Sequence, residues 1–150
     1  MTKEELRVGN IIEVNHFEYG DMYASVTSIN DVGDLCLHLL DERFTKEEYE
    51  CTMNELCPIP ITEELLEKIG FKKNSFGWWR LDKRNDKFMI KSYSQLSTLS
   101  TIEYWNEVHN PEDVTETNYG STIELPYKIH LHTFQNIFHL LTGNELDIKL

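Results

Sequence analysis

Apolar and polar residues alternate along several short segments near the start of the chain, which is the period of a half-buried β-strand. Ile12 and Val14 alternate with polar neighbours, and β-branched and aromatic residues are frequent at positions 23–29. After a group of turn-forming residues, positions 35–39 place three leucines on one face. Short strands joined by turns at this spacing predict an SH3-like small barrel or a bent antiparallel sheet at the N-terminus.

Two short helices are predicted further along the chain. The first covers about residues 62–69, because Thr62 can accept hydrogen bonds from the first amides and Gly70 can supply a left-handed exit. The second covers about residues 132–142, where apolar side chains recur at helical spacing and Gly143 follows the last turn.

Strand patterns return between the two helices, most clearly at residues 87–91 and 101–108. We therefore predict an α+β, β-rich fold in which a second antiparallel sheet accompanies the helices. The length predicts a single domain over residues 1–150, and a soft boundary near its two clustered prolines would divide it into sub-lobes 1–57 and 58–150.

The number of cysteines and the hydropathy of the chain indicate in which cellular compartment the protein is expected. The three cysteines are odd in number and form no CxxC pair, so we expect reduced thiols rather than a disulfide framework. No apolar run reaches the roughly 18 residues of a spanning helix, and the N-terminus lacks the apolar stretch of a signal peptide. These features predict a protein of the host-cell cytoplasm that does not engage a membrane.

Charge is distributed unevenly along the chain, whose formal net charge is −12. Residues 1–67 contain sixteen acidic and four basic residues, residues 68–91 contain two acidic and eight basic residues, and residues 92–150 contain eight acidic and two basic residues. Two kinds of partner are compatible with this pattern: a basic protein surface met by the acidic segments, or a nucleic-acid strand held by the basic middle.

Motifs for catalysis or for a bound cofactor are not evident. His130 and His132 form an HxH pair, and Cys36 and His38 would share a strand face, but neither pair has an obvious third or fourth ligand. No nucleophile elbow, Cys-His signature or phosphate-binding glycine loop is present. We therefore expect no enzyme activity, no catalytic residue, no metal and no cofactor.

The basic segment 72–91 interleaves cations with aromatic residues, a combination that suits single-stranded RNA or DNA because rings stack on bases while cations meet phosphates. The alternative is that the rings are core and the cations solvate an outer face or pair with acids. The residues expected to contact nucleic acid are Lys73, Trp78, Trp79, Arg80, Lys83, Arg84 and Lys87.

The acidic residues form two crowded segments, one before residue 57 and one after residue 102. Clustered carboxylates can imitate a phosphate backbone and steer a protein onto a basic nucleic-acid channel, although a solvated face is the simpler interpretation of any single position. The residues expected to contact a partner are Glu42, Glu47, Glu48, Glu50, Glu107, Glu112, Asp113 and Glu116.

Three blocks of sequence resemble a family of small proteins from phages and prophages of Bacteroidota. That family opens with Leu-Arg-x-Gly-Asn, carries a central Pro-Ile-Pro-Leu-Thr-Glu-Glu segment that ends in Gly-Phe, and closes with a helix containing Gln-Asn and Leu-Thr-Gly. The matching stretches here are Leu6–Asn10, Pro58–Phe71 and His132–Leu146. The resemblance implies a phage or prophage origin and carries over no activity or catalytic residue.

Together, charge and resemblance favour a non-enzymatic, anti-CRISPR-like inhibitor that binds a host nucleic-acid-guided nuclease through its acidic segments. The partner would be a host protein or ribonucleoprotein. One alternative is an RNA- or single-strand-binding accessory protein that uses segment 72–91, with direct RNA contact. Another is a structural or assembly protein of the phage particle, which charge does not distinguish from the others.

Overall fold

The alternating segment at the start of the chain forms strand β1 (Ile11–His16), which pairs antiparallel with β2 (Gly20–Ile29). The side chains of Ile12 and Val14 are fully buried, whereas that of Asn15 is exposed. The period of two therefore places the apolar residues on one face of the sheet, as predicted. The structure, a computed structural model, describes residues 1–16, 18–31, 33–44, 48–83, 86–92, 99–106, 119–124 and 129–148.

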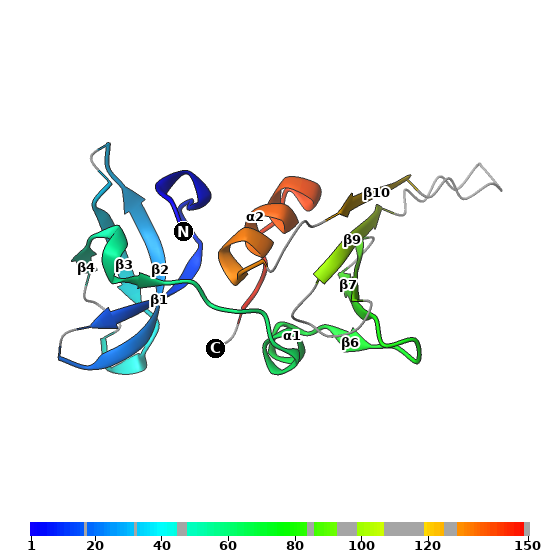
Figure 1. Ribbon diagram of the computed structural model, residues 1–150, viewed down its shortest axis with the longest axis horizontal. Coiled ribbons are helices and arrows are strands. Elements are labelled where there is room, and N and C mark those ends of the chain that lie inside the picture. The colour runs from blue at the N-terminus through cyan, green and yellow to red at the C-terminus, as the bar shows by residue number, and fades with distance from the viewer. Residues whose placement is uncertain are drawn as a thin grey trace. The chain divides into compact units, whose positions relative to one another are not determined.

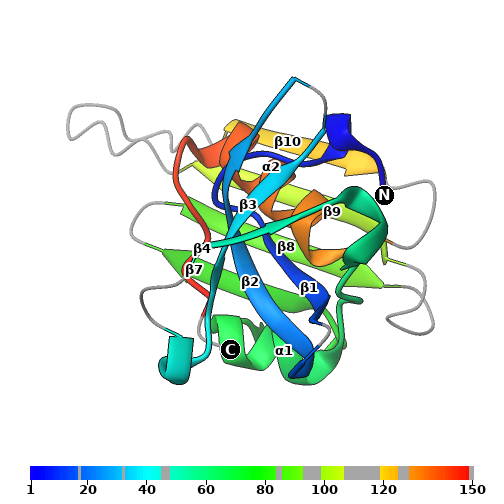
Figure 2. The same ribbon diagram turned by 90° about the vertical axis from the view of Figure 1, so that its left-hand side faces the viewer.

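The first sheet has five antiparallel strands in the order β4-β3-β2-β1-β5. The other three strands are β3 (Leu35–Leu39), β4 (Glu48–Cys51) and β5 (Leu56–Cys57). β2 is the longest of the five and lies in the middle of the order (Figures 1 and 2). Its pairing with β3 shifts register between Val26 and Ser28, and such an irregularity bends a strand.

No pairing among the described strands joins β4 to β5, so the sheet stays open. The closed SH3-like barrel is therefore wrong, and the alternative of a bent antiparallel sheet is confirmed. Three short 3₁₀ helices accompany the sheet: η1 (Lys3–Glu5), η2 (Glu42–Phe44) and η3 (Met53–Glu55). The inward face of the sheet forms an apolar cluster, whose buried members are Leu6, Ile12, Val14, Met22, Ala24, Val26, Leu35, Leu37, Leu39, Cys51 and Leu56.

The predicted C-terminal helix is α2 (Leu131–Thr142), and it ends at Gly143 in the left-handed conformation. Gln135, on its second turn, is buried and satisfies two backbone groups at the start of β1. The N–H of Ile11 donates to Oε1 of Gln135 at 2.8 Å, and Nε2 of Gln135 donates to the carbonyl oxygen of Gly9 at 3.2 Å. Gly9 has φ +90°, a conformation that favours glycine. The helix therefore fixes the point at which β1 begins.

Asn136 extends this connection. Its Oδ1 accepts from Nε of Arg7 at 2.8 Å and from Nδ2 of Asn10 at 2.9 Å, while its Nδ2 donates to the carbonyl oxygen of Glu5 at 2.8 Å. Arg7 also makes two hydrogen bonds of 2.7 Å to the carboxylate of Glu145. We name the hydrogen bonds of Arg7, Asn10, Gln135 and Asn136 the amide latch. The first and third sequence blocks of the family resemblance meet in it.

The helix predicted at about residues 62–69 is α1 (Glu63–Ile69). Its N-cap Thr62 accepts a hydrogen bond from the N–H of Leu65 at 3.1 Å, and Gly70 follows at φ +101°. Both helix predictions are thus confirmed in position and in their caps.

A second five-stranded antiparallel sheet follows, in the order β10-β9-β8-β7-β6. Cross-strand pairing aligns Trp79, Ile90, Ile102 and Ile123 in one row across four strands. The side chains of Trp79, Ile90 and Ile102 are at most 1% exposed, so this row lies on the core side of the sheet. Its strands are β6 (Lys72–Lys73), β7 (Trp79–Lys83), β8 (Asp86–Ser92), β9 (Leu99–Asn106) and β10 (Tyr119–Glu124).

The chain divides into two compact units. The first contains residues 1–60 and 130–146 together with residue 150, and the second contains residues 61–129 and 147–149. The N-terminal sheet and α2 therefore belong to one unit although the chain between them builds the other. The single domain expected from chain length stays a prediction. Among the described residues, no helix combines the length and the apolar character needed to cross a bilayer.

The amide latch makes a prediction about stability. Replacing Gln135 with alanine leaves the buried N–H of Ile11 and the part-buried carbonyl of Gly9 without their side-chain partner, so the free energy of unfolding should fall by about 3 kcal/mol. Urea denaturation followed by circular dichroism measures it. The control is Asn54→Ala at an exposed position on η3, which should change stability by less than about 0.5 kcal/mol. Equal stabilities of the two variants would contradict the role of the latch.

Candidate functional site

Three of the eight acidic residues expected at a partner contact are described, and all three side chains are exposed. Glu42 lies on η2, and Glu48 and Glu50 lie on β4, which is an edge strand of the first sheet. The other five predicted acidic residues lie outside the described residues: Glu47, Glu107, Glu112, Asp113 and Glu116.

Strand register places Glu48 opposite His38 and Glu50 opposite Cys36 on β3. The intervening residue Tyr49 faces Leu37, which is fully buried on the other side of the sheet. The two glutamates therefore share the outward side of the strand pair. We define the acidic face as the outward positions of β3 and β4, namely Cys36, His38, Glu48 and Glu50.

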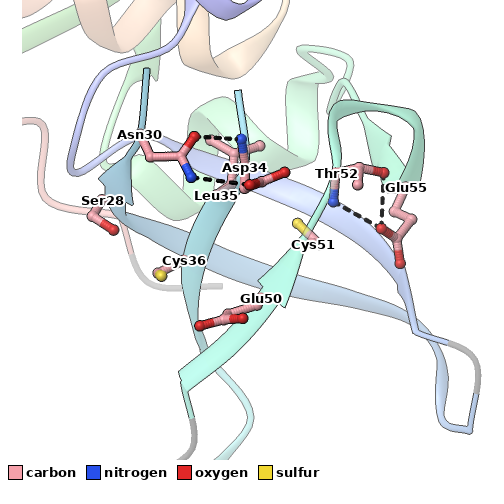
Figure 3. Close-up of a pocket in the computed structure, with 9 residues that line it drawn as sticks. All are labelled: Ser28, Asn30, Asp34, Leu35, Cys36, Glu50, Cys51, Thr52 and Glu55. Atoms are coloured by element: carbon pink, nitrogen blue, oxygen red, sulfur yellow. Dashed lines mark hydrogen bonds between the residues drawn. The ribbon is translucent and has the colours of Figure 1, made fainter. Parts of the chain in front are cut away.

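A pocket of about 280 Å³ lies at one end of the acidic face, between β3, β4 and the adjoining turns (Figure 3). The carboxylates of Asp34, Glu50 and Glu55 line it. Hydrogen bonds position two of them. Asn30 donates to Asp34 at 3.0 Å, and the N–H of Thr52 donates to Glu55 at 2.8 Å. The backbone hydrogen bond from Thr52 is the main cause that lowers the pKa of Glu55, so this carboxylate is held in its charged form.

Cys51 also lines this pocket, but its chemistry is that of a core residue. Burial raises the pKa of its thiol to about 12, with a smaller contribution from Glu55. Because the thiolate is the nucleophile and the metal ligand, a thiol with this pKa is inert at neutral pH.

The cations of the first unit are already engaged. Its described lysine and arginine residues are Lys3, Arg7 and Arg43. Lys3 donates to the carbonyl oxygen of Asp31 at 2.9 Å, and Arg7 pairs with Glu145. Arg43 pairs with Asp41 at 2.6 Å, and its side-chain hydrogen bonds lower the pKa of that carboxyl to about 2. None of the three lies on the acidic face.

An aromatic groove at the other end of the acidic face was not predicted. It has a volume of about 280 Å³. Tyr19, Tyr23 and Leu40 line it and are 46%, 43% and 39% exposed. Strand periodicity indicates that Tyr23 points outward, but only the turn after β3 brings Leu40 beside it: the N–H of Leu40 donates to the carbonyl oxygen of Tyr23 at 2.9 Å.

The predicted nucleic-acid contacts fall into several environments in the second unit. Trp79 is 1% exposed and belongs to the core, so the expectation that it stacks on a base is wrong. Trp78 and Arg80 are half-buried, and Lys73 is exposed. Nζ of Lys73 is paired with Glu63 at 2.6 Å and lies 5.4 Å from the centroid of the Trp79 ring.

A basic hollow nevertheless exists beside these residues. It has a volume of about 180 Å³ and is lined by Lys72, Lys73 and Arg80 together with Asn74 and Gly70. Lys72 lies directly opposite Arg80 in the β6–β7 pairing.

Further along the same sheet, two of the predicted contact residues lie opposite acidic residues in the strand register. Lys83 lies opposite Asp86, and Lys87 lies opposite Asp82. Arg84, the remaining predicted contact, lies outside the described residues.

The histidine pair lies at the start of α2. The rings of His130 and His132 are nearly parallel, at 7°, with centroids 5.9 Å apart. His132 is 2% exposed, and its Nδ1 has no hydrogen-bond partner among the described residues. Burial lowers its pKa to about 4, and the nearby His130 adds to this effect. Within the described ranges, no group of three or more potential metal ligands comes together.

Comparison with family models, with curated proteins and with solved structures found no match. The structure by itself therefore establishes the class: an α+β, β-rich protein whose described residues form two antiparallel sheets and two α-helices. The resemblance to the Bacteroidota phage family stays a prediction.

His132 predicts a pH dependence of stability. Its folded-state pKa of about 4 lies below the ordinary 6.5. As pH falls below about 6.5, His132 therefore binds a proton in the unfolded chain but not in the folded chain. This difference favours unfolding. The free energy of unfolding should drop by about 2 kcal/mol between about pH 7 and pH 5, above the range in which the carboxylates titrate.

Urea denaturation at several pH values measures this slope, and His132→Leu should flatten it. His139→Gln, at an exposed position on the same helix, should keep it. A slope that persists unchanged in His132→Leu would show that another group is responsible.

Proposed function

We propose that this protein is a non-enzymatic binding protein whose acidic face occupies a basic, nucleic-acid-binding surface of a partner protein. In its most specific form, the partner is a nucleic-acid-guided nuclease of a host, and binding inhibits it. The observation that carries the proposal is the pair of exposed glutamates, Glu48 and Glu50, on an edge strand of an open sheet.

Charged residues in the two sheets lie opposite different kinds of residue, and this contrast favours a protein partner. In the second sheet, Lys83 and Lys87 each lie opposite an aspartate. In the first sheet, Glu48 and Glu50 lie opposite a histidine and a cysteine. Opposite charges on directly facing residues stabilise a strand pair, and the acidic strand has neither lysine nor arginine across from Glu48 or Glu50.

The spacing of the glutamates supports phosphate mimicry. Residues two apart on a strand lie about 7 Å from each other on the same side, so the strand displays its negative charges in a regular row. Asp34 and Glu55 extend the acidic surface at the pocket. A row of carboxylates complements a surface built to bind a nucleic-acid backbone and accelerates association through its field. The resemblance to a phage family supports a host nuclease as the owner of that surface.

A second function, direct binding of single-stranded nucleic acid, is supported by the basic hollow of Lys72, Lys73 and Arg80. Two observations make it the weaker proposal. Lys73 is already paired with Glu63, and Trp79 is buried and cannot stack on a base.

The favoured function predicts that capture of the partner depends on the acidic face. Immobilised protein is exposed to host lysate with and without RNase, the captured nuclease is purified, and its affinity is measured by surface plasmon resonance. Glu48→Gln combined with Glu50→Gln should weaken binding about tenfold or more, because two charge contacts are lost. Binding by the unmodified protein should also weaken steeply from about 0.05 M to about 0.5 M salt.

The matched control is Glu18→Gln combined with Glu67→Gln, which removes the same charge from exposed positions outside the acidic face. It should leave affinity within about twofold, since long-range attraction to distant charges is screened. If the two double variants bind equally weakly, net charge rather than the acidic face directs binding. If no nuclease is captured, the specific form of the proposal is wrong.

The alternative function is tested with labelled single-stranded RNA and no protein partner. We expect no mobility shift at physiological salt, because the net charge repels phosphates. A shift that Lys72→Glu combined with Arg80→Glu abolishes would favour the alternative. Lys68→Glu, at an exposed position on α1 outside the hollow, is the single-charge control.

A further inference from the structure

We infer that the aromatic groove of the first unit is a docking site for an extended, proline-rich peptide segment that carries arginine or lysine. The inference rests on the proposed function in one respect, since the groove adjoins the acidic face and the segment would belong to the same basic partner. It adds the chemistry by which that partner is anchored.

Exposed apolar side chains concentrate at this groove. Among the described residues, seven large hydrophobic side chains are exposed, and three of them, Tyr19, Tyr23 and Leu40, line this one groove. The buried side chain of Met22 contributes to the same lining. Scattered exposed apolar residues need no explanation, whereas a group that shares one concave surface indicates a binding site.

The groove is also partly preorganised. The ring of Tyr19 stacks on His16 with centroids 4.8 Å apart, and it lies 4.7 Å from the ring of Phe44. His16 is itself buried and contacts the ring of Tyr49 at 4.8 Å. A ring held in this way loses little conformational freedom when a ligand binds, which favours affinity.

Charge determines which ligand suits these rings. Arg43 is neutralised by its bidentate pairing with Asp41, so the cation beside the groove is already satisfied. Asp21, also in the lining, accepts a hydrogen bond of 2.8 Å from the amide of Asn15, a neutral donor that does not balance a negative charge. Glu13 lies opposite Tyr23 in the β1–β2 register. The surroundings therefore attract a cationic ligand and repel the phosphates of a nucleic acid.

The acidic face continues directly from the groove. His38, opposite Glu48, precedes Leu40 by two residues, and Ser25, opposite His38, follows Tyr23 by two residues. One extended segment could thus set apolar groups against the rings and cations over the carboxylates. Proline-rich segments fit this requirement, because they are extended before binding and their flat rings pack on tyrosine.

The test uses fluorescein-labelled peptides and the intact protein, with binding read by fluorescence anisotropy. A peptide of repeated Pro-Pro-Arg is the probe. Repeated Gly-Gly-Arg has the same charge without the extended conformation, and repeated Pro-Pro-Glu has the opposite charge. We expect the Pro-Pro-Arg peptide to bind at least about tenfold more tightly than either control peptide.

Substitutions then locate the binding. Tyr23→Ala should weaken binding of the Pro-Pro-Arg peptide about tenfold or more, as should Leu40→Asp. Phe76→Ala, at a residue 77% exposed in the second unit, is the aromatic control and should have no effect. Because Tyr23 is exposed, loss of its ring should preserve the fold, which circular dichroism verifies.

The outcomes separate the inference from the proposed function. If Gly-Gly-Arg binds as tightly as Pro-Pro-Arg and Tyr23→Ala has no effect, the groove inference fails while binding through the acidic face stands. If no peptide binds, the inference is also wrong. Binding of a labelled oligothymidine that Tyr23→Ala abolishes would overturn it in favour of base stacking. Loss of Pro-Pro-Arg binding in Tyr23→Ala together with its retention in Phe76→Ala supports it.

Discussion

The architecture of the first unit depends on the hydrogen bonds of Gln135 and Asn136 to the segment before β1. They fix where β1 begins, because the N–H of Ile11 and the carbonyl of Gly9 both bond to Gln135. A strand that slips by one residue turns every side chain to the opposite face. β1 pairs with β2, β2 with β3, and β3 with β4. The register of β1 therefore determines which side of the sheet the glutamates of the acidic face occupy.

The strand register also explains why the acidic region is the better candidate for partner binding than the basic region. On β7 and β8, the strand register sets Lys83 and Lys87 opposite aspartates. On β4, the glutamates lie across from residues with no fixed positive charge, and the described cations of this unit bond elsewhere. A negatively charged surface that no cation of its own unit balances gains the most favourable electrostatic energy from a basic partner.

Function was only partly predictable at the level of residues. The sequence predicted Glu48 and Glu50 as contact residues, but only the pairing of β4 with β3 places them on one side of a strand. Periodicity could not distinguish Trp78 from Trp79 as the core residue, because adjacent strand residues differ only in which face the rest of the fold covers. The aromatic groove was missed for a related reason: Tyr23 and Leu40 are distant in sequence and meet through strand pairing.

The sequence by itself determined the local elements. The alternation of Ile12 and Val14, the Thr62 cap and the glycines after both helices predicted these elements from nearest-neighbour chemistry. Tertiary structure alone decided that the sheet stays open rather than closing into a barrel, and that α2 joins the N-terminal unit across the intervening chain. The place of α2 in the first unit depends on hydrogen bonds between residues more than 120 positions apart, such as Gln135 with Ile11, and no local pattern records such bonds.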